Sequence, residues 1–387
     1  GLAIVLDSFP RHQHGTANTI FGTGVMFGPV AGPVIGGFIA EFYHWSWIFY
    51  FNLPFGLVAI VACWFLLPKG SRDAARAFDW LGFAALVIAV GALQLILNRG
   101  ERLDWFDSLE IALEAAVMVL SIYVFVVHSL TARRPFVELA IFRDRNVVTG
   151  LFLVVVWAFL LHGTLVLLSL MMQELRGYPV ITLGYVLAPR GLGVVLGMFA
   201  GNILLRHFDP RYIMTFGFVC LAISAWAMSQ WTADVGAWAV IWTGALQGFS
   251  SGATFVPLSV KTFSTIERRY RAEGLTMFMM LLMVGIGAGI AVAVNVLTRS
   301  TTVLRATLSE HVTDYNELLR YSFIPETWDT GSMAGLAAIE VEIMRQAAMI
   351  GYLNYFYLVA VMAIGAIPLI FLFSKGKLTA ETLEHHD

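Results

Sequence analysis

The feature that most constrains this chain is a series of apolar runs, each about as long as a membrane is thick. A helix needs about 20 consecutive apolar residues to cross the hydrocarbon core of a bilayer. Such runs recur along almost all of the 387 residues. Only 13% of the residues are charged, against about 25% in a typical soluble domain. The sequence therefore predicts an all-α polytopic membrane protein, and excludes a soluble enzyme, a disordered chain and a disulfide-rich secreted domain.

The apolar runs predict ten membrane-spanning helices after Asp7. They lie at about 16–40, 48–67, 81–97, 109–130, 147–171, 183–205, 213–229, 237–260, 275–297 and 351–373. Most connections are short, but the polar connection before the last span covers about 299–348. Residues 1–6 resemble the end of a further span, so we expect the sequence to be a fragment of a longer protein.

Lys and Arg predict the orientation, because they are concentrated in alternate connections. The rich segments are 68–79, 131–146, 206–211 and 261–271. The short connections between them hold only Arg99, Arg102 and Arg176. Short loops rich in Lys and Arg stay in the cytoplasm. The rich segments and the C-terminus are therefore predicted to be cytoplasmic, and the acidic connection at 299–348 extracytoplasmic.

The densest motif in the chain combines spaced glycines with prolines in the first predicted span. Glycines four residues apart share one helix face, along which a neighbouring helix can approach closely. The prolines remove backbone donors and favour a bend. Generic helix packing explains a single glycine pair better than it explains this combination. The motif residues are Gly24, Gly28, Pro29, Gly32, Pro33, Gly36 and Gly37.

Two further glycine stripes with the same spacing lie in later spans. They are Gly193, Gly197 and Gly201, and then Gly244, Gly248 and Gly252. Residues 248–252 also fit the G-x-S-x-G pattern of hydrolases, but that motif needs a strand–turn–helix setting. The sequence holds no Walker loop, so we expect neither ATP-driven transport nor a cofactor, and no metal site. We expect the protein not to be an enzyme.

Polar side chains inside predicted spans mark candidate cavity residues, because they are costly in a membrane. The candidates are Gln94, His162, Gln247 and Asn295. A hydrogen bond between helices is the alternative for each amide, whereas His162 titrates near working pH and could contact substrate or protons. Arg190, Asp209 and Arg211 are candidate gating or loop residues. We expect Arg190 to reach the outer interface, and Asp209 and Arg211 to form a cytoplasmic clasp.

The glycine–proline stripe resembles the antiporter signature in the fifth helix of major facilitator superfamily drug/proton antiporters. Residues 44–56, His-Trp-Ser-Trp-Ile-Phe-Tyr-Phe-Asn-Leu-Pro-Phe-Gly, resemble the entry to the sixth helix in the fourteen-helix EmrB/QacA subfamily. Further similar segments are 78–82, 98–105, 135–143 and 188–193. The resemblance extends from residue 1 to about 302.

This resemblance implies two helix bundles, the first incomplete, with two extra helices inserted between them. The implied divisions are a first-bundle remnant at 1–67, linking helices and loops at 68–146, a six-helix second bundle at 147–374 and a cytoplasmic tail at 375–387. The acid of the family's first helix and the basic residue of its fourth, both linked to proton coupling, lie outside the sequence.

The resemblance further implies proton-coupled export of lipophilic, often cationic, compounds across the cytoplasmic (inner) membrane by alternating access. The implied partners are the small-molecule substrate, protons and the lipid bilayer, with a membrane-fusion accessory protein as an additional candidate. A net charge of −2 without a basic face argues against nucleic acid. Two alternatives stay open: an exporter of one metabolite, lipid or siderophore in the same fold, and a non-transporting membrane receptor or enzyme.

Cysteine labelling in intact cells tests the predicted orientation. In the full-length protein with Cys63 and Cys220 replaced by Ser, an impermeant thiol reagent should label Glu317→Cys but not Arg143→Cys. Permeabilised cells should label both, which controls for accessibility. Labelling of position 143 without position 317 in intact cells would show that the orientation is inverted.

Overall fold

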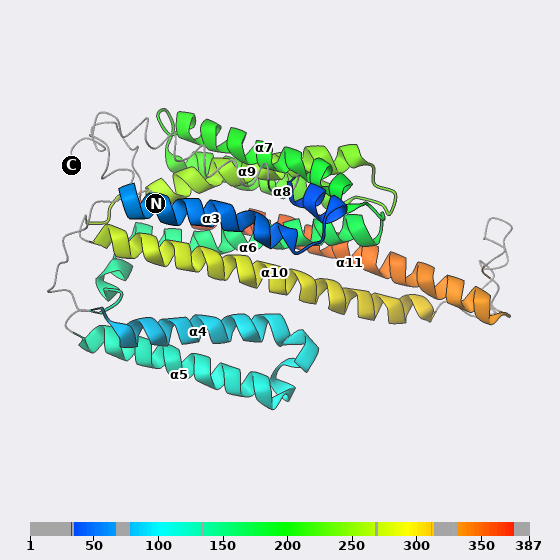
Figure 1. The fold of residues 1–387 in the computed structure, drawn as a ribbon, viewed down its shortest axis with the longest axis horizontal. Helices are drawn as coiled ribbons and strands as arrows, with labels where there is room; N and C mark the ends of the chain where they lie inside the picture. The colour runs from blue at the N-terminus through cyan, green and yellow to red at the C-terminus, as the bar shows by residue number, and fades with distance from the viewer. Residues whose placement is uncertain are drawn as a thin grey trace.

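The computed structural model shows long helices aligned along one axis (Figure 1). It describes residue 32, residues 35–66, 78–132, 135–267, 270–310, 312 and 328, and residues 331–374. Gly24, Gly28, Pro29 and Pro33 of the glycine–proline motif lie outside the described residues. All regular secondary structure in the described part of the chain is helical, which confirms the predicted fold class.

The described helices follow the predicted spans closely up to residue 262. A short helix covers 35–42. The long helices are α3 (Trp47–Leu66), α4 (Trp80–Arg99), α5 (Leu109–Thr131), α6 (Arg145–Glu174), α7 (Val180–Leu204), α8 (Pro210–Ser229), α9 (Ala237–Thr262), α10 (Arg271–Ser309) and α11 (Met333–Ile370). In the described residues, eight of these are long and apolar enough to span a membrane. The exception is α9, which packs among the others although it is less apolar.

Local sequence signals explain where several of these helices begin. Asp144 precedes α6, and its side chain accepts hydrogen bonds from the N–H groups of Asn146 and Val147. Asp209 precedes α8 and accepts from the N–H of Arg211, at 3.0 Å. An aspartate at this position satisfies backbone donors that have no partner inside the helix. Pro210 suits the first position of α8 because that residue needs no donor.

The last two helices differ from the sequence prediction, because both continue beyond the apolar runs. Helix α10 extends to Ser309 instead of 297, and α11 begins at Met333 instead of 351. Much of the predicted 299–348 connection is therefore a pair of helix extensions, which project past the other helices in Figure 1. Arg305 Nε donates to Glu340 Oε1 at 2.6 Å between them. Hydropathy missed the extensions because Ala, Glu, Arg and Met favour helix without being uniformly apolar.

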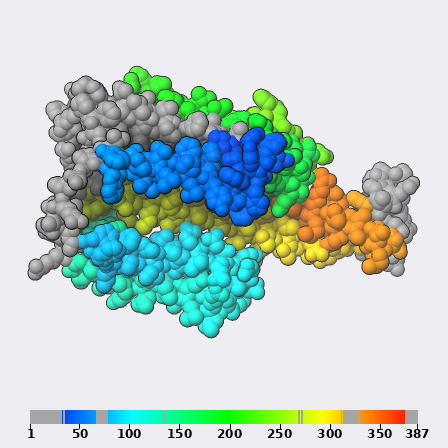
Figure 2. Space-filling model, in the orientation of Figure 1, coloured from blue at the N-terminus to red at the C-terminus, as the bar shows by residue number. Residues whose placement is uncertain are grey.

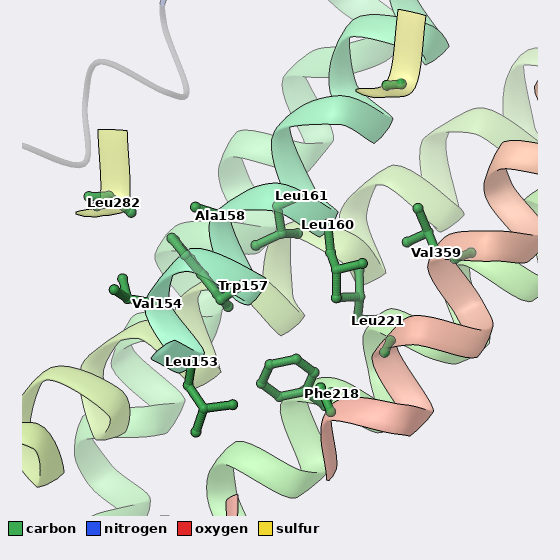
Figure 3. Close-up of a cluster of buried hydrophobic side chains, with 14 of the residues drawn as sticks. Leu153, Val154, Trp157, Ala158, Leu160, Leu161, Phe218, Leu221, Leu282 and Val359 are labelled. Carbon is green, nitrogen blue, oxygen red and sulfur yellow. The ribbon is translucent and has the colours of Figure 1, made fainter. Parts of the chain in front are cut away.

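The most buried part of the structure lies between α6, α8 and α11. Phe218 of α8 and Leu160 of α6 are at most 1% exposed, and Figure 3 shows side chains from the three helices converging there. Three fully buried aromatic residues of α11 extend this core: Tyr352, Tyr355 and Phe356. Lipid is as apolar as these side chains, so close packing, not escape from water, holds such helices together.

Helix α3 contrasts with that core. None of its residues with a described exposure is buried, and Trp64 is 81% exposed. Figure 2 shows α3, in blue, lying on the surface of the molecule. The segment before α3 approaches α7 at Gly37, where an added Cβ would lie 2.9 Å from the Val180 carbonyl oxygen. At Gly32 and Gly36 an added Cβ would meet no described atom within 4 Å, so a packing role for those two stays a prediction.

Helices α4 and α5 form a separate pair beside α10 (Figure 1). The Asp79 carboxylate fixes one end of this pair by binding three segments. It accepts from the N–H of Gly82 in α4 at 3.0 Å, from the N–H of Phe136 at 2.8 Å, and it lies 2.8 Å from His128 Nε2 of α5. Burial alone would raise the pKa of Asp79, but the hydrogen bonds from these groups lower the pKa below its usual value.

We predict that Asp79→Ala lowers the free energy of unfolding by about 1–2 kcal/mol, because it removes a helix cap and leaves the Phe136 N–H unpaired. Thermal unfolding of the purified full-length protein in detergent measures this loss. Since the folded-state pKa is depressed, the stabilisation is present above the unfolded pKa of about 3.9 and is lost as the pH falls through the folded value. Asp107→Ala, at an exposed position, is the matched control. An equal effect of both variants would contradict the role of Asp79.

Candidate functional site

The site is built on two helices, α7 and α9, that approach each other through their glycine stripes. A Cβ added at Gly193 or Gly197 of α7 would overlap the carbonyl oxygens of Ala245 or Phe249 in α9. The relation is reciprocal. A Cβ at Gly248 of α9 would overlap the Arg190 carbonyl oxygen, and one at Gly252 would overlap that of Val194. The two stripes noted in the sequence therefore face each other and set the spacing of this helix pair.

Helix α9 carries several buried polar side chains, and hydrogen bonds connect it to its neighbour α8. Ser250 Oγ donates to the Gly217 carbonyl of α8 at 2.7 Å. Ser224 Oγ of α8 donates to the Thr243 carbonyl at 2.8 Å. Hydrogen bonds of this kind between membrane helices are worth about 0.6–2 kcal/mol each. Glycines on one face and hydroxyls on another thus hold α9 between α7 and α8.

The structure places Arg190 inside the bundle, and the expected extension to the outer interface is wrong. Arg190 lies about 15 Å along α7 from its first residue, near the middle of the helix. Its guanidinium donates to Gln247 Oε1 of α9 and, at 2.9 Å, to the Leu161 carbonyl of α6. Both acceptors belong to helices that neighbour α7, so the side chain lies between α6, α7 and α9.

His162 follows directly after Leu161 and lies beside this cluster. Its Nδ1 is 3.0 Å from the Ala158 carbonyl, which can only accept, so the neutral ring carries its hydrogen on Nδ1 and leaves Nε2 as an acceptor. The ring of Trp157 lies one helical turn away, with centroids 6.4 Å apart. Trp157 and Leu161 are seen on neighbouring turns of α6 in Figure 3. We refer to Arg190, Gln247, His162 and Trp157 as the Arg190 cluster.

The other two predicted cavity residues lie elsewhere. Gln94 of α4 donates to the Val284 carbonyl of α10 at 3.3 Å. Asn295 of α10 donates to the Leu97 carbonyl of α4 at 3.4 Å. Both amides therefore connect α4 to α10, which is the helix–helix role left open for them in the sequence. Of the four candidates, the structure brings only His162 and Gln247 together.

Asp209 and Arg211 act at the cytoplasmic end predicted from the charges, but not as a side-chain pair. Asp209 accepts from the backbone N–H of Arg211, while the buried Arg211 guanidinium donates to the Phe373 carbonyl after α11. The two residues thus fix the start of α8 and connect it to the segment that follows α11. A gating role for them stays a prediction.

A second link at the same end was not found by sequence reasoning. Asn146 Nδ2 donates to Ser374 Oγ at 2.9 Å, and the Ser374 N–H donates to Asn146 Oδ1 at 2.8 Å. Thr265 donates to Asp144 Oδ2 at 2.6 Å. The start of α6 is thus bound to the segments that follow α9 and α11. Single Asn, Ser and Thr residues at helix ends carry no sequence signal for contacts this distant.

The described residues contain no group of three or more His, Cys, Asp or Glu side chains that could hold a metal ion. Within the helix bundle, the described residues instead place the Arg190 guanidinium beside the amide of Gln247. Hydrogen-bonding groups of this kind can bind and release a polar group reversibly.

Comparison with known proteins decides the family. The family model described as Major Facilitator Superfamily matches residues 1–290. The chain belongs to the major facilitator superfamily. Members of this superfamily are membrane transporters, and the eight membrane-capable helices of the described residues agree with a multi-pass membrane protein.

Among the superfamily's characterised members, the chain is similar to multidrug export proteins. It is 32% identical to "Multidrug export protein EmrB" of Escherichia coli (strain K12) over 323 residues, which are 81% of this chain and 62% of that protein. It is 29% identical to "Fatty acid resistance protein FarB" of Neisseria gonorrhoeae over 96% of this chain and 73% of that protein. The matched region thus spans less than two thirds of the EmrB sequence.

A solved structure supports the superfamily fold. The described helices match a bacterial homologue of the human lysosomal transporter Spinster, in an inward-facing and occupied conformation, with a TM-score of 0.51. The match covers 96% of this chain and 72% of that one, at 16% sequence identity. At that identity the likeness concerns the fold alone.

We predict that Gly248→Ala lowers the free energy of unfolding by about 1–3 kcal/mol, the usual cost of overpacking, because the new methyl group must displace the Arg190 backbone. Gly365→Ala in α11 is the matched control, since an added Cβ there meets nothing within 4 Å. Denaturant titration of both purified full-length variants in the same detergent gives the comparison. A stability loss at Gly365 as large as that at Gly248 would show that the α7–α9 contact is not special.

Proposed function

We propose that the protein exports lipophilic compounds across the cytoplasmic membrane in exchange for protons. The observation that carries this proposal is the similarity to multidrug export proteins along 81–95% of the chain. The fold supports it, since transporters of this kind bind substrate near the middle of the membrane between two bundles. Arg190 lies near the middle of α7, and we propose that the Arg190 cluster forms the second bundle's part of such a site.

We propose the division predicted from the sequence for the working transporter. Residues 1–67 belong to the first bundle, 68–146 supply the linking helices α4 and α5, and 147–374 form the second bundle. In alternating access the bundles rock against each other around the substrate. The contact of Gly37 with the start of α7 is a point where such rocking would be transmitted. The connections rich in Lys and Arg, and the C-terminus, are proposed to face the cytoplasm.

A second candidate function is the export of one particular metabolite or lipid. The printed name of FarB concerns resistance to fatty acids, and that protein is 29% identical to this chain. A transporter dedicated to one compound would respond to a single member of a chemical panel. A multidrug exporter would respond to several unrelated members.

Accumulation assays on the full-length gene test the proposal. Cells expressing the protein should accumulate less of at least one lipophilic compound than cells with an empty vector. Dissipating the proton gradient should restore accumulation, because the bundles would then lack their driving force. Expression must be matched by membrane immunoblot. Lower accumulation that persists without a proton gradient would contradict proton coupling, and unchanged accumulation of every compound would contradict export.

A further inference from the structure

Resting on the proposed export function, we infer that the Arg190 cluster binds the anionic group of its substrate, so that the preferred compounds are lipophilic acids and not lipophilic cations. The chemistry meant is an apolar body carrying one carboxylate. The argument depends on what surrounds the arginine and on which polar atoms near it lack partners.

The arginine is a membrane-depth cation without a counter-ion in the described part of the chain. The partners of its guanidinium there are the Gln247 amide oxygen and the Leu161 carbonyl. No described carboxylate forms an ion pair with it within 4.0 Å. Charged groups inside membranes are expensive and usually pair or serve a ligand. Two neutral acceptors leave the positive charge uncompensated.

A buried donor without a partner belongs to the amide that the arginine binds. Gln247 is fully buried, and because its Oε1 accepts from Arg190, its Nε2 is left with no hydrogen-bond partner. The buried Trp157, whose ring neighbours that of His162, also has an Nε1–H with no partner. A buried donor without a partner costs about as much as a lost hydrogen bond, so such atoms call for an explanation. An incoming acceptor group would satisfy them.

The remaining titratable group of the cluster does not reverse this preference. His162 is uncharged when Nδ1 donates to Ala158 and Nε2 accepts. When protonated, it adds a second positive charge next to Arg190. In neither state does it carry a negative charge that could neutralise a cationic substrate. Glu174, the acid at the far end of α6, is engaged by the Tyr352 hydroxyl at 3.1 Å and lies about 18 Å along the helix from His162.

The geometry also explains why an arginine suits the binding of a carboxylate. A guanidinium presents several donors in one plane and binds a carboxylate through two of them. Its two present partners come from α6 and α9, so the planar group is held in place before substrate arrives. Arg190 and Gln247 would provide the polar contacts, while Trp157 and the ring of Phe255, 5.2 Å from it between centroids, offer apolar surface for the body of the compound.

Binding of three probes with the same ten-carbon chain tests the inference: decanoate, methyl decanoate and decyltrimethylammonium. The full-length protein in lipid nanodiscs is compared with empty nanodiscs by equilibrium dialysis at neutral pH, where the acid is ionised. Decanoate should bind more tightly than the other two. Arg190→Gln should weaken decanoate binding by about tenfold or more and change decyltrimethylammonium binding by less than about twofold. Arg190→Lys should retain part of the affinity, because it keeps the charge.

Arg206→Gln is the control variant, since this arginine is exposed at the end of α7 and lies outside the cluster. It should leave decanoate binding unchanged. The wild-type comparison of the three probes stands even where Arg190→Gln fails to fold. Tighter binding of decyltrimethylammonium than of decanoate by the wild type would overturn the inference, as would unchanged decanoate binding by a folded Arg190→Gln protein.

Transport of the same probes in proteoliposomes separates this inference from the proposed function. Decanoate that binds through Arg190 but is not exported would refute export and leave the anion site intact. Export of decyltrimethylammonium alone would support export and refute the anion site. A second acid with an aromatic body, 2-naphthoate, distinguishes a site for alkyl chains from a site for lipophilic acids in general, and binding of either acid through Arg190 supports the inference.

Discussion

The contact of α7 with α9, backbone against backbone, is the constraint on which the packing of α6 to α11 depends. Each helix presents glycines where the other presents carbonyl oxygens, so that a methyl group at Gly193, Gly197, Gly248 or Gly252 has no room. In a membrane, where lipid competes equally for apolar side chains, such close approach is a main source of helix association. Arg190 lies at this contact, because its carbonyl lies against Gly248 and its guanidinium binds acceptors of α6 and α9.

Helix α9, which is less apolar than the eight candidate spans, lies at the centre of this contact and carries polar side chains into it. Helix α9 contributes Gln247 to the Arg190 cluster and uses Ser250 to bind α8. Polar groups inside the bundle are tolerated because each of these has a neighbour on another helix. Helix α3 is more apolar, and none of its described side chains is buried. It therefore adds no buried polar side chain to the site. Helix α6, which is strongly apolar, supplies His162 and Trp157 to the same cluster.

The sequence was sufficient for the fold class and for most helix positions, because apolar length is a local property. It predicted α4 to α9 to within a few residues, and the superfamily from its motifs. It failed for Arg190, since whether an arginine turns toward water or inward depends on the neighbouring helix. It also missed the ends of α10 and α11, where helix continues outside the apolar run. Pairings such as Asn146 with Ser374 join residues too far apart in sequence for any local pattern to indicate.

The extensions of α10 and α11 have a mechanical consequence. With 39 residues and a rise of 1.5 Å per residue, α10 is about 58 Å long, roughly twice the thickness of the hydrocarbon core. The Arg305–Glu340 pair connects its outer part to α11, so the two extensions form a stiff arm attached to the second bundle. When the helices from which the arm extends tilt, the displacement of the arm's tip grows in proportion to the length of the arm. A rotation of about 10° displaces a point 30 Å away by about 5 Å, a shift comparable to one helical turn.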